Sequence, residues 1–182
     1  MEKRIYLIRH CEAEGQPVEA RLTEKGVKQA ETLSDFFSNI QVDCIISSPF
    51  LRAIQSIEPT SLTQNAKIEL DERLSERILS TSNMPDWLDK LKATFVDRDL
   101  TYEGGESSCK AADRIVSVVE EVLASDCETA LIVTHGNLLS LLLNAYDQSF
   151  GFDQWKGLSN PDVYLLRFTE RQPHVERLWM TD

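Results

Sequence analysis

The chain alternates between short apolar segments and longer segments in which apolar residues recur at helical spacing. Two of the short segments, 5–8 and 129–134, lack polar alternation, which is typical of strands covered on both faces. The pattern predicts strands at 5–8, 42–46, 67–70, 129–134, 163–168 and 175–179. The segment Arg171-Gln172-Pro173 between the last two resembles the turn of a hairpin.

Apolar residues at spacings of three and four predict helices between the strands. One helix follows Thr23, a residue type that caps helices. A second follows Pro49, and we expect Pro59 to kink or end it, because the proline ring removes a donor and clashes with the preceding turn. Further helices are predicted from 85 onward, over 115–123 and over 138–145. Strands that alternate with helices predict an α/β fold with a parallel sheet.

Length and composition place the chain among globular proteins. Its 182 residues suit a single domain, 1–182, and a hydrophobic content of 42% excludes a disordered class. No apolar run approaches the length of a membrane span and the N-terminus lacks a signal-peptide pattern, so we expect a cytoplasmic protein without membrane contact. Its four cysteines are far apart with no CxxC pair, and in that compartment we expect reduced thiols.

The formal net charge of −11 disfavours nucleic acid as a partner, because a broad negative field repels polyanions. It permits a small phosphorylated substrate in a local basic pocket. The sequence does not predict the oligomeric state.

Basic side chains follow several predicted strands directly. Arg9 and His10 end the first strand, Arg52 lies on the first turn after the second, and His135 follows the strand 129–134. Because ligands of parallel sheets bind beyond the carboxyl ends of the strands, we expect these four side chains to converge on one anionic group. The alternatives are surface ion pairs for the arginines and a strand-capping role for the histidine.

Two histidines and two arginines around a phosphoryl group suit covalent catalysis. A neutral imidazole nitrogen of His10 can attack phosphorus, giving a phosphohistidine that water then hydrolyses. Arg9, Arg52 and a protonated His135 would hold the phosphoryl oxygens and stabilise the transferring charge. We expect this chemistry to need no metal and no cofactor.

The leaving group also needs a proton, which a carboxyl group can supply. Glu76, in the segment after the third predicted strand, is the preferred candidate. Position alone leaves Glu72, Glu103 and Glu106 open as alternatives.

Several short motifs in order resemble the histidine phosphatase superfamily, the phosphoglycerate mutase-like group whose opening motif is Arg-His-Gly. They are Leu7-Ile8-Arg9-His10, Leu22-Thr23-Glu24-Lys25-Gly26 with Gln29-Ala30, Ser47-Ser48-Pro49 with Arg52-Ala53 and Gln55, Leu74-Ser75-Glu76, Gly104-Gly105-Glu106-Ser107, and Val133-Thr134-His135-Gly136. Each motif is weak by itself, but their order and spacing together are specific. The resemblance implies a three-layer sandwich with a mostly parallel central sheet and helices on both faces.

Carried over residue by residue, the resemblance implies that His10 is the phosphorylated nucleophile and Glu76 the proton donor. It implies a phosphate pocket formed by Arg9, Arg52 and His135.

Some positions depart from the family pattern. Cys11 replaces the motif glycine, Ala13 stands where Ser or Thr is usual, and Gln16 where Asn commonly faces the phosphate. Gln16 can still donate an amide hydrogen bond, so we keep it as a substrate contact. The Gly-x-x-Glu-Gly continuation often seen after the acid is absent. For Cys11 we weigh two interpretations, a small residue that fits, or a thiol of lowered pKa that is sensitive to oxidation.

The sequence favours a phosphomonoesterase over a mutase. The family's mutases are longer, with an inserted segment that adds cationic residues, whereas the segment between Glu76 and Glu103 has no arginine pair. The alternatives are phosphoglycerate mutase-type transfer and a weakly active member that binds a phosphorylated ligand or regulates a partner.

Overall fold

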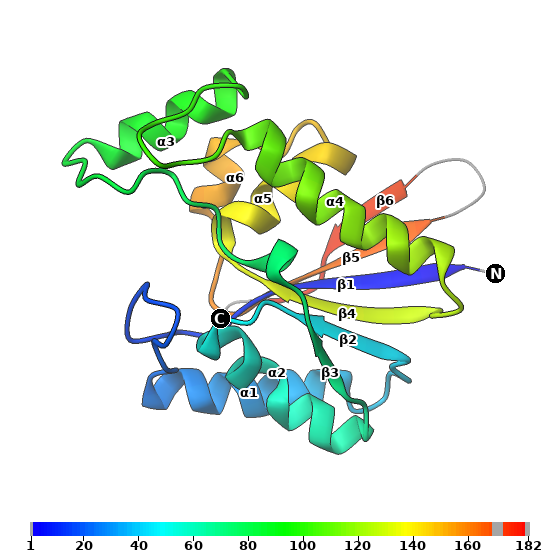
Figure 1. Cartoon of the computed structure of the whole chain (residues 1–182). Helices are drawn as coiled ribbons and strands as arrows, with labels where there is room; N and C mark the ends of the chain where they lie inside the picture. The colour runs from blue at the N-terminus through cyan, green and yellow to red at the C-terminus, as the bar shows by residue number, and fades with distance from the viewer. Residues whose placement is uncertain (1, 169–172, 181–182) are drawn as a thin grey trace.

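The fold is built on a six-stranded sheet, shown in Figure 1 for the computed structural model, which describes residues 2–168 and 173–180. The strands are β1 (Lys3–Arg9), β2 (Cys44–Ser47), β3 (Ile68–Leu70), β4 (Thr129–Thr134), β5 (Asp162–Phe168) and β6 (Pro173–Arg177). Their order is β3-β2-β4-β1-β5-β6, in which β1 to β4 pair in parallel and β5 and β6 are antiparallel to their neighbours. The predicted α/β fold with a mostly parallel sheet is therefore confirmed. Most of the predicted hairpin turn, at Arg171 and Gln172, lies outside the described residues.

Helices cover both faces of the sheet, as Figure 1 shows. On one face lie α1 (Glu24–Phe37) and α2 (Leu51–Gln64), and on the other α4 (Ser108–Ala124), α5 (Gly136–Tyr146) and the short α6 (Phe152–Lys156). A single 3-10 turn, η1 (Glu72–Leu74), follows β3, and α3 (Trp87–Val96) extends from the body of the molecule beside α6. Each face of the sheet has its own hydrophobic core.

Local sequence accounts for the main helices. Thr23 caps α1 by accepting a hydrogen bond from the Gly26 backbone N–H at 2.9 Å, and Ser107 caps α4 in the same way. The side chains from Leu138 to Leu143 in α5 are all buried, as its nearly all-apolar sequence predicts. This helix follows β4 directly, so its N-terminus lies at the edge of the sheet where the parallel strands end.

The prediction that Pro59 kinks or ends its helix is wrong. Helix α2 continues through Pro59 to Gln64. Ile57 and Thr60 on either side of the proline are fully buried, and α2 packs along α1. This burial offsets the loss of a backbone hydrogen bond, a cost on the order of 3 kcal/mol.

The parallel strands bring distant segments to one edge of the sheet. Arg9 at the end of β1 pairs in register with Thr134 at the end of β4, and Ser47 at the end of β2 pairs with Val133. His10, Ser48 and His135 are therefore the first residues past three adjacent strands. The expected convergence of the strand ends is thus produced by strand pairing.

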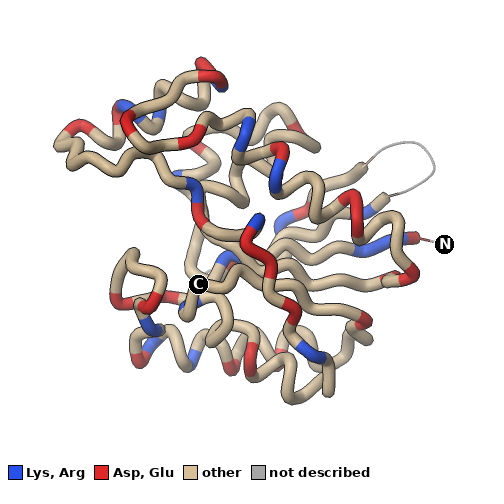
Figure 2. Tube along the Cα trace, viewed as in Figure 1, with Lys and Arg blue, Asp and Glu red and all other residues tan. Residues whose placement is uncertain are grey.

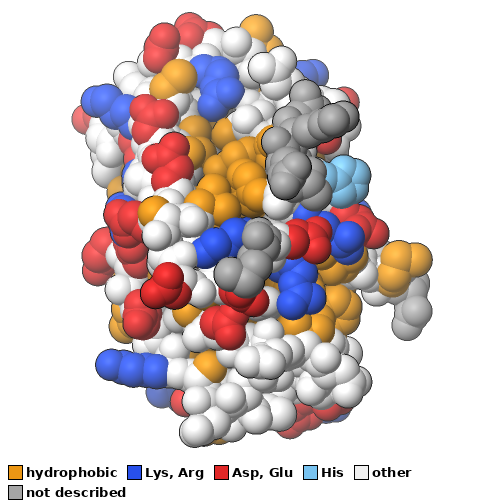
Figure 3. All heavy atoms as spheres, turned by 90° about the vertical axis from the view of Figure 1, so that its right-hand side faces the viewer, with side chains coloured by type: hydrophobic (Ala, Val, Ile, Leu, Met, Phe, Trp, Pro, Cys, Tyr) orange, Lys and Arg blue, Asp and Glu red, His pale blue; other side chains and the backbone are white. Residues whose placement is uncertain are grey.

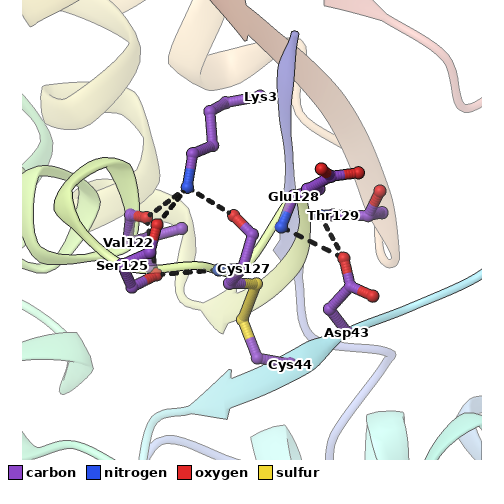
Figure 4. Close-up of a disulfide and its surroundings, with 8 residues drawn as sticks. All are labelled: Lys3, Asp43, Cys44, Val122, Ser125, Cys127, Glu128 and Thr129. Carbon is purple, nitrogen blue, oxygen red and sulfur yellow. Dashed lines mark hydrogen bonds between the residues drawn. A yellow bond between two sulfur atoms is a disulfide. The ribbon is translucent and has the colours of Figure 1, made fainter. Parts of the chain in front are cut away.

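The opposite end of the sheet holds a disulfide between Cys44 and Cys127, shown in Figure 4. Around it, Lys3 donates to the carbonyl oxygens of Ser125 and Cys127, and Asp43 accepts from the backbone N–H of Thr129 at 2.8 Å. The expectation of four reduced thiols is therefore wrong for this pair. The two cysteines are separated by 83 positions in the sequence, and only the pairing of β2 with β4 brings them together.

Charged residues are spread over the molecule. Figure 2 shows Asp and Glu on helices and loops on both sides of the sheet. Figure 3, which faces the end where β1 begins, shows apolar side chains between charged ones. None of the helices in the described part of the chain has the length and apolar character needed to cross a bilayer.

Candidate active site

His10 is held in one tautomer by the residue that follows it. Its Nδ1 lies 2.7 Å from the Cys11 carbonyl oxygen, which can only accept, so Nδ1 carries the proton and Nε2 keeps its lone pair. Burial is the largest cause that lowers the pKa of His10, to about 3, and the charges of Arg52 and Arg9 act in the same direction. The ring is therefore neutral at physiological pH, as a nucleophile requires.

Arg52 lies directly against this nitrogen. Its Nε donates to His10 Nε2 at 3.2 Å, and its Nη1 donates to the carbonyl oxygens of Gln16 and Pro17 at 3.0 and 2.8 Å. The side chain is 1% exposed, and its guanidinium also lies over the Phe50 ring. One cation thus joins the nucleophile to the loop over residues 12–21.

His135 packs beside His10, with ring centroids 5.1 Å apart, and is fully buried. Its Nε2 lies 2.7 Å from the Ser48 hydroxyl, while its buried Nδ1 has no partner among the described residues. Burial, followed by the charges of His10, Arg52 and Arg9, lowers the pKa of His135 well below its ordinary value. Desolvation thus disfavours the cation in the free protein, and the protonated His135 expected around a bound phosphoryl group stays a prediction.

Arg9 reaches over the start of α5. Its Nη1 donates to the carbonyl oxygens of Leu158 and Ser159, both at 3.3 Å, and its buried Nε has no partner among the described residues. A Cβ at Gly136 would lie 3.0 Å from the Arg9 guanidinium carbon. The absence of a side chain at 136 therefore allows the close approach of the guanidinium.

Glu76 is fixed at the N-terminus of α5. Its Oε1 accepts from the backbone N–H groups of Arg77 and Leu138 at 2.8 and 2.9 Å, and its Oε2 accepts from that of Asn137 at 3.0 Å. The start of a helix attracts carboxylates because its first N–H groups have no partners within the helix. The helix that follows His135 thus positions the predicted acid as well.

The three alternative acids lie elsewhere. Glu106 forms an ion pair with Arg114, while Glu103 and Glu72 bond to nearby serine hydroxyls. None of the three lines the cavities at the site. The geometry therefore favours Glu76.

Two adjoining cavities open at this edge of the sheet. The smaller, of about 130 Å³, reaches His10 and is lined also by Glu12, Ala13, Gly15 and Asn160. The larger, of about 380 Å³, is lined beyond the acid by Leu79, Trp87, Leu91 and Trp155. Arg9, Gln16, Glu76 and Gly136 line both. The predicted substrate contact Gln16 therefore lies between the two, whereas the predicted pocket residues Arg52 and His135 are buried, line neither cavity and contact His10 instead.

Cys11 faces away from this space. Its side chain is fully buried in the core between the sheet and helices α1 and α2, and burial raises the pKa of its thiol to about 12. The redox interpretation, which required a lowered pKa, is wrong. The alternative of a small residue that fits agrees with the packing.

Three residues of the site were not predicted to act there. Ser48 contacts His135, the Asn160 side chain donates to the His10 carbonyl oxygen at 2.8 Å, and Asn137 lines the larger cavity. Ser48 and Asn137 lie next to the predicted strand ends, a position that signals proximity to the site. Asn160 comes from the segment before β5, and no motif indicated it.

Comparison with known proteins agrees with this geometry. The sequence profile of the histidine phosphatase superfamily (branch 1) matches residues 5–181. The chain therefore belongs to the histidine phosphatase superfamily. Within it, the chain is 27% identical to phosphoserine phosphatase 1 of Hydrogenobacter thermophilus over 198 aligned residues, which cover 98% of this chain and 92% of the relative.

Solved structures of this superfamily share the fold. A mycobacterial glucosyl-3-phosphoglycerate phosphatase superposes with a TM-score of 0.78 at 21% identity, covering 97% of both chains. A phosphoglycerate mutase from Bacillus anthracis gives 0.76 at 19% identity, covering 97% of this chain and 92% of the mutase. The predicted family, the phosphoglycerate mutase-like fold and the phosphatase class are confirmed, whereas the role of each site residue stays a prediction.

Proposed function

We propose that this histidine phosphatase hydrolyses a small phosphomonoester through a phosphohistidine at His10. The observation that carries the proposal is the fixed tautomer of His10, whose Nδ1–H donates to the Cys11 carbonyl oxygen and leaves Nε2 as the attacking atom. The neighbouring cavity of about 130 Å³ provides space for a phosphoryl group beside Arg9.

In the first step, Nε2 of His10 forms a bond to phosphorus as the bond from phosphorus to the ester oxygen breaks. Arg9 and Arg52 stabilise the charge on the phosphoryl oxygens. Glu76 gives its proton to the departing oxygen. Its Oε2 accepts one backbone hydrogen bond where Oε1 accepts two, so we assign the proton transfer to Oε2.

In the second step, water attacks the phosphohistidine while the Glu76 carboxylate accepts one of its protons. The bond from nitrogen to phosphorus breaks, and Nε2 recovers its lone pair. The hydrogen bond from Nδ1 to Cys11 supports the positive ring of the intermediate. None of the proposed steps uses a metal ion, so we propose metal-independent turnover without a cofactor.

Hydrolysis is favoured over mutase action by the character of the larger cavity. A mutase must retain and re-dock a bisphosphorylated intermediate, which calls for a strongly basic pocket. The wall beyond Glu76 is instead formed mainly by leucine and tryptophan side chains. A purely regulatory member would not require an acid, a nucleophile and an arginine at one cavity.

The test is hydrolysis of para-nitrophenyl phosphate with a metal chelator present, for the wild type and for His10→Ala. We expect turnover with the chelator and its loss in the variant. Rapid quenching should trap a phosphoenzyme that is labile in acid and stable in base, as phosphohistidine is. Turnover that requires a divalent metal, or that survives His10→Ala, excludes the mechanism.

We propose a single domain over 1–182 and residence in the cytoplasm, without a nucleic-acid or membrane partner. The Cys44–Cys127 disulfide weighs against a strongly reducing compartment. Counting free thiols in protein taken directly from cells, alkylated at lysis, would test the location.

A further inference from the structure

Resting on the proposed phosphatase function, we infer that Trp87 and Trp155 bind the leaving group of the substrate. The preferred substrates are then phosphomonoesters whose leaving group has a flat, largely apolar body. Small zwitterionic leaving groups such as serine are poor fits.

The first support is continuity between the two cavities. The larger cavity shares four lining residues with the smaller cavity at His10, among them Arg9 and Glu76. A phosphoryl group at His10 would therefore direct its ester oxygen past Glu76 and its leaving group into the larger cavity. The volume of about 380 Å³ is within the range of small-molecule sites.

The second support is the pair of indole rings on the far wall. Trp87 from α3 and Trp155 from α6 meet edge to face, with ring centroids 6.5 Å apart at 87°. Trp87 is 49% exposed. An aromatic ring that is exposed beside a cavity gains burial when a flat ligand covers it.

A second aromatic contact holds the Trp155 ring in place. It stacks on Phe152 at 5.5 Å, and Phe152 in turn contacts Phe95 of α3 at 5.9 Å. The ammonium groups of Lys92 and Lys156 lie near the Phe152 ring. The indole is thus held in place before a ligand arrives, which lowers the entropic cost of binding.

The polar groups of the cavity offer little to a small charged leaving group. The Arg77 guanidinium is already bonded to the Glu106 carbonyl oxygen at 3.0 Å and to the Thr94 hydroxyl at 3.0 Å. Among the residues that the structure describes, Glu76 is the only acid that lines the larger cavity, and its proposed role is proton transfer. An ammonium group would therefore find no carboxylate left to pair with.

One donor does remain. The Asn137 Nδ2 is buried without a partner among the described residues, and the residue lines the cavity. A hydrogen-bond acceptor on the leaving group would satisfy it. The favoured leaving group is therefore flat and apolar with one acceptor, not a bare hydrocarbon.

The experiment compares 2-naphthyl phosphate, phenyl phosphate and phosphoserine. The two aryl leaving groups have similar acidity, so a difference in kcat/KM between them reports contacts in the cavity. We expect the wild type to favour the naphthyl ester by about 10-fold. Trp155→Ala and Trp87→Ala should each reduce that ratio about 5-fold, mainly through KM, and we expect phosphoserine to be the poorest of the three substrates for the wild type.

Trp179→Ala is the matched control, because Trp179 contacts Phe36 on the other side of the sheet and does not line the larger cavity. It should leave the naphthyl to phenyl ratio unchanged. Thermal unfolding of each variant checks that the fold is intact. A wild-type ratio near one, or a ratio that neither cavity tryptophan affects, overturns the inference while leaving the phosphatase proposal in place.

A second measurement does not depend on turnover. Calorimetric titration of His10→Ala should show tighter binding of 2-naphthyl phosphate than of phenyl phosphate, and Trp155→Ala in that background should remove the difference. Equal binding of the two esters overturns the inference. If the wild type has no phosphatase activity but this binding preference is present, only the proposed function is overturned.

Discussion

Arg52 donates a hydrogen bond from Nε to Nε2 of His10 at 3.2 Å, so a buried cation lies against the nitrogen that we propose to attack phosphorus. The same guanidinium donates to two carbonyl oxygens of the loop over 12–21. The contact helps to keep His10 neutral, and the proposed mechanism assigns the same guanidinium to the phosphoryl oxygens.

Arg52→Lys should therefore impair catalysis without a loss of charge. A lysine offers one point of positive charge and cannot reach His10 and the loop together. We expect kcat/KM for para-nitrophenyl phosphate to fall about 10²- to 10³-fold. Arg73→Lys, at an exposed ion pair with Asp71 and Glu121, is the control and should stay within twofold. A loss of less than threefold in Arg52→Lys would contradict the assigned role.

Glu76→Gln should slow the enzyme in a way that depends on the leaving group. An alkoxide needs a proton to depart, whereas para-nitrophenolate leaves without one. We expect kcat for an alkyl phosphate to fall about 10²- to 10⁴-fold and kcat for para-nitrophenyl phosphate to fall much less. Equal losses on both substrates would indicate that Glu76 only supports the start of α5.

Stability should fall as the pH falls below neutrality, because His10 and His135 are buried as neutral rings. The pKa of His10 drops from 6.5 to about 3 on folding, so the unfolded chain binds the proton first. For His10 the contribution is complete above pH 6.5 and is lost progressively between pH 6.5 and about 3, at up to about 1.4 kcal/mol per pH unit. The lowered pKa of His135 acts in the same direction.

Urea unfolding of the wild type and His10→Gln at several pH values measures this dependence. The variant should lose stability less steeply over that range, because one of the two buried histidines is gone. Parallel slopes for the two proteins would show that His10 ionises freely in the folded state.

The disulfide should stabilise the fold without affecting chemistry. The bridge closes a separation of 83 residues, for which the expected contribution to the free energy of unfolding is about 2–4 kcal/mol. Cys44→Ser should lose that amount in the absence of reductant and retain wild-type kcat/KM. With reductant, the wild type should approach the variant. Four alkylatable thiols in denatured, unreduced wild type would contradict the bridge.

Much of the fold follows from the apolar patterns. The run 129–134 is a strand with every residue buried, and Thr23 begins its helix where the cap predicts. Pro59 shows the limit of local rules, since the burial of neighbouring side chains decides its effect. Such packing cannot be judged from a window of sequence.

The site divides in a similar way. Arg9 ends β1, and His10 and His135 directly follow strands, so the rule for strand ends finds all three. Asn160 and Trp155 belong to segments far along the chain that no strand-end rule covers, and only the folded structure brings them to the cavities. The burial that lowers the pKa of His135 in the free protein also cannot be read from the motif.

Because Gly136 has no side chain, helix α5 can position two groups of the candidate site together. Arg9 packs against Gly136, the first residue of α5, and the first backbone N–H groups of the helix donate to Glu76. The cation proposed for the phosphoryl group and the acid proposed for the departing oxygen are therefore both held by this helix. A tilt of this helix would therefore shift Arg9 and Glu76 together. Substitutions among its buried leucines should therefore change turnover, although the leucines from Leu138 to Leu143 line neither cavity.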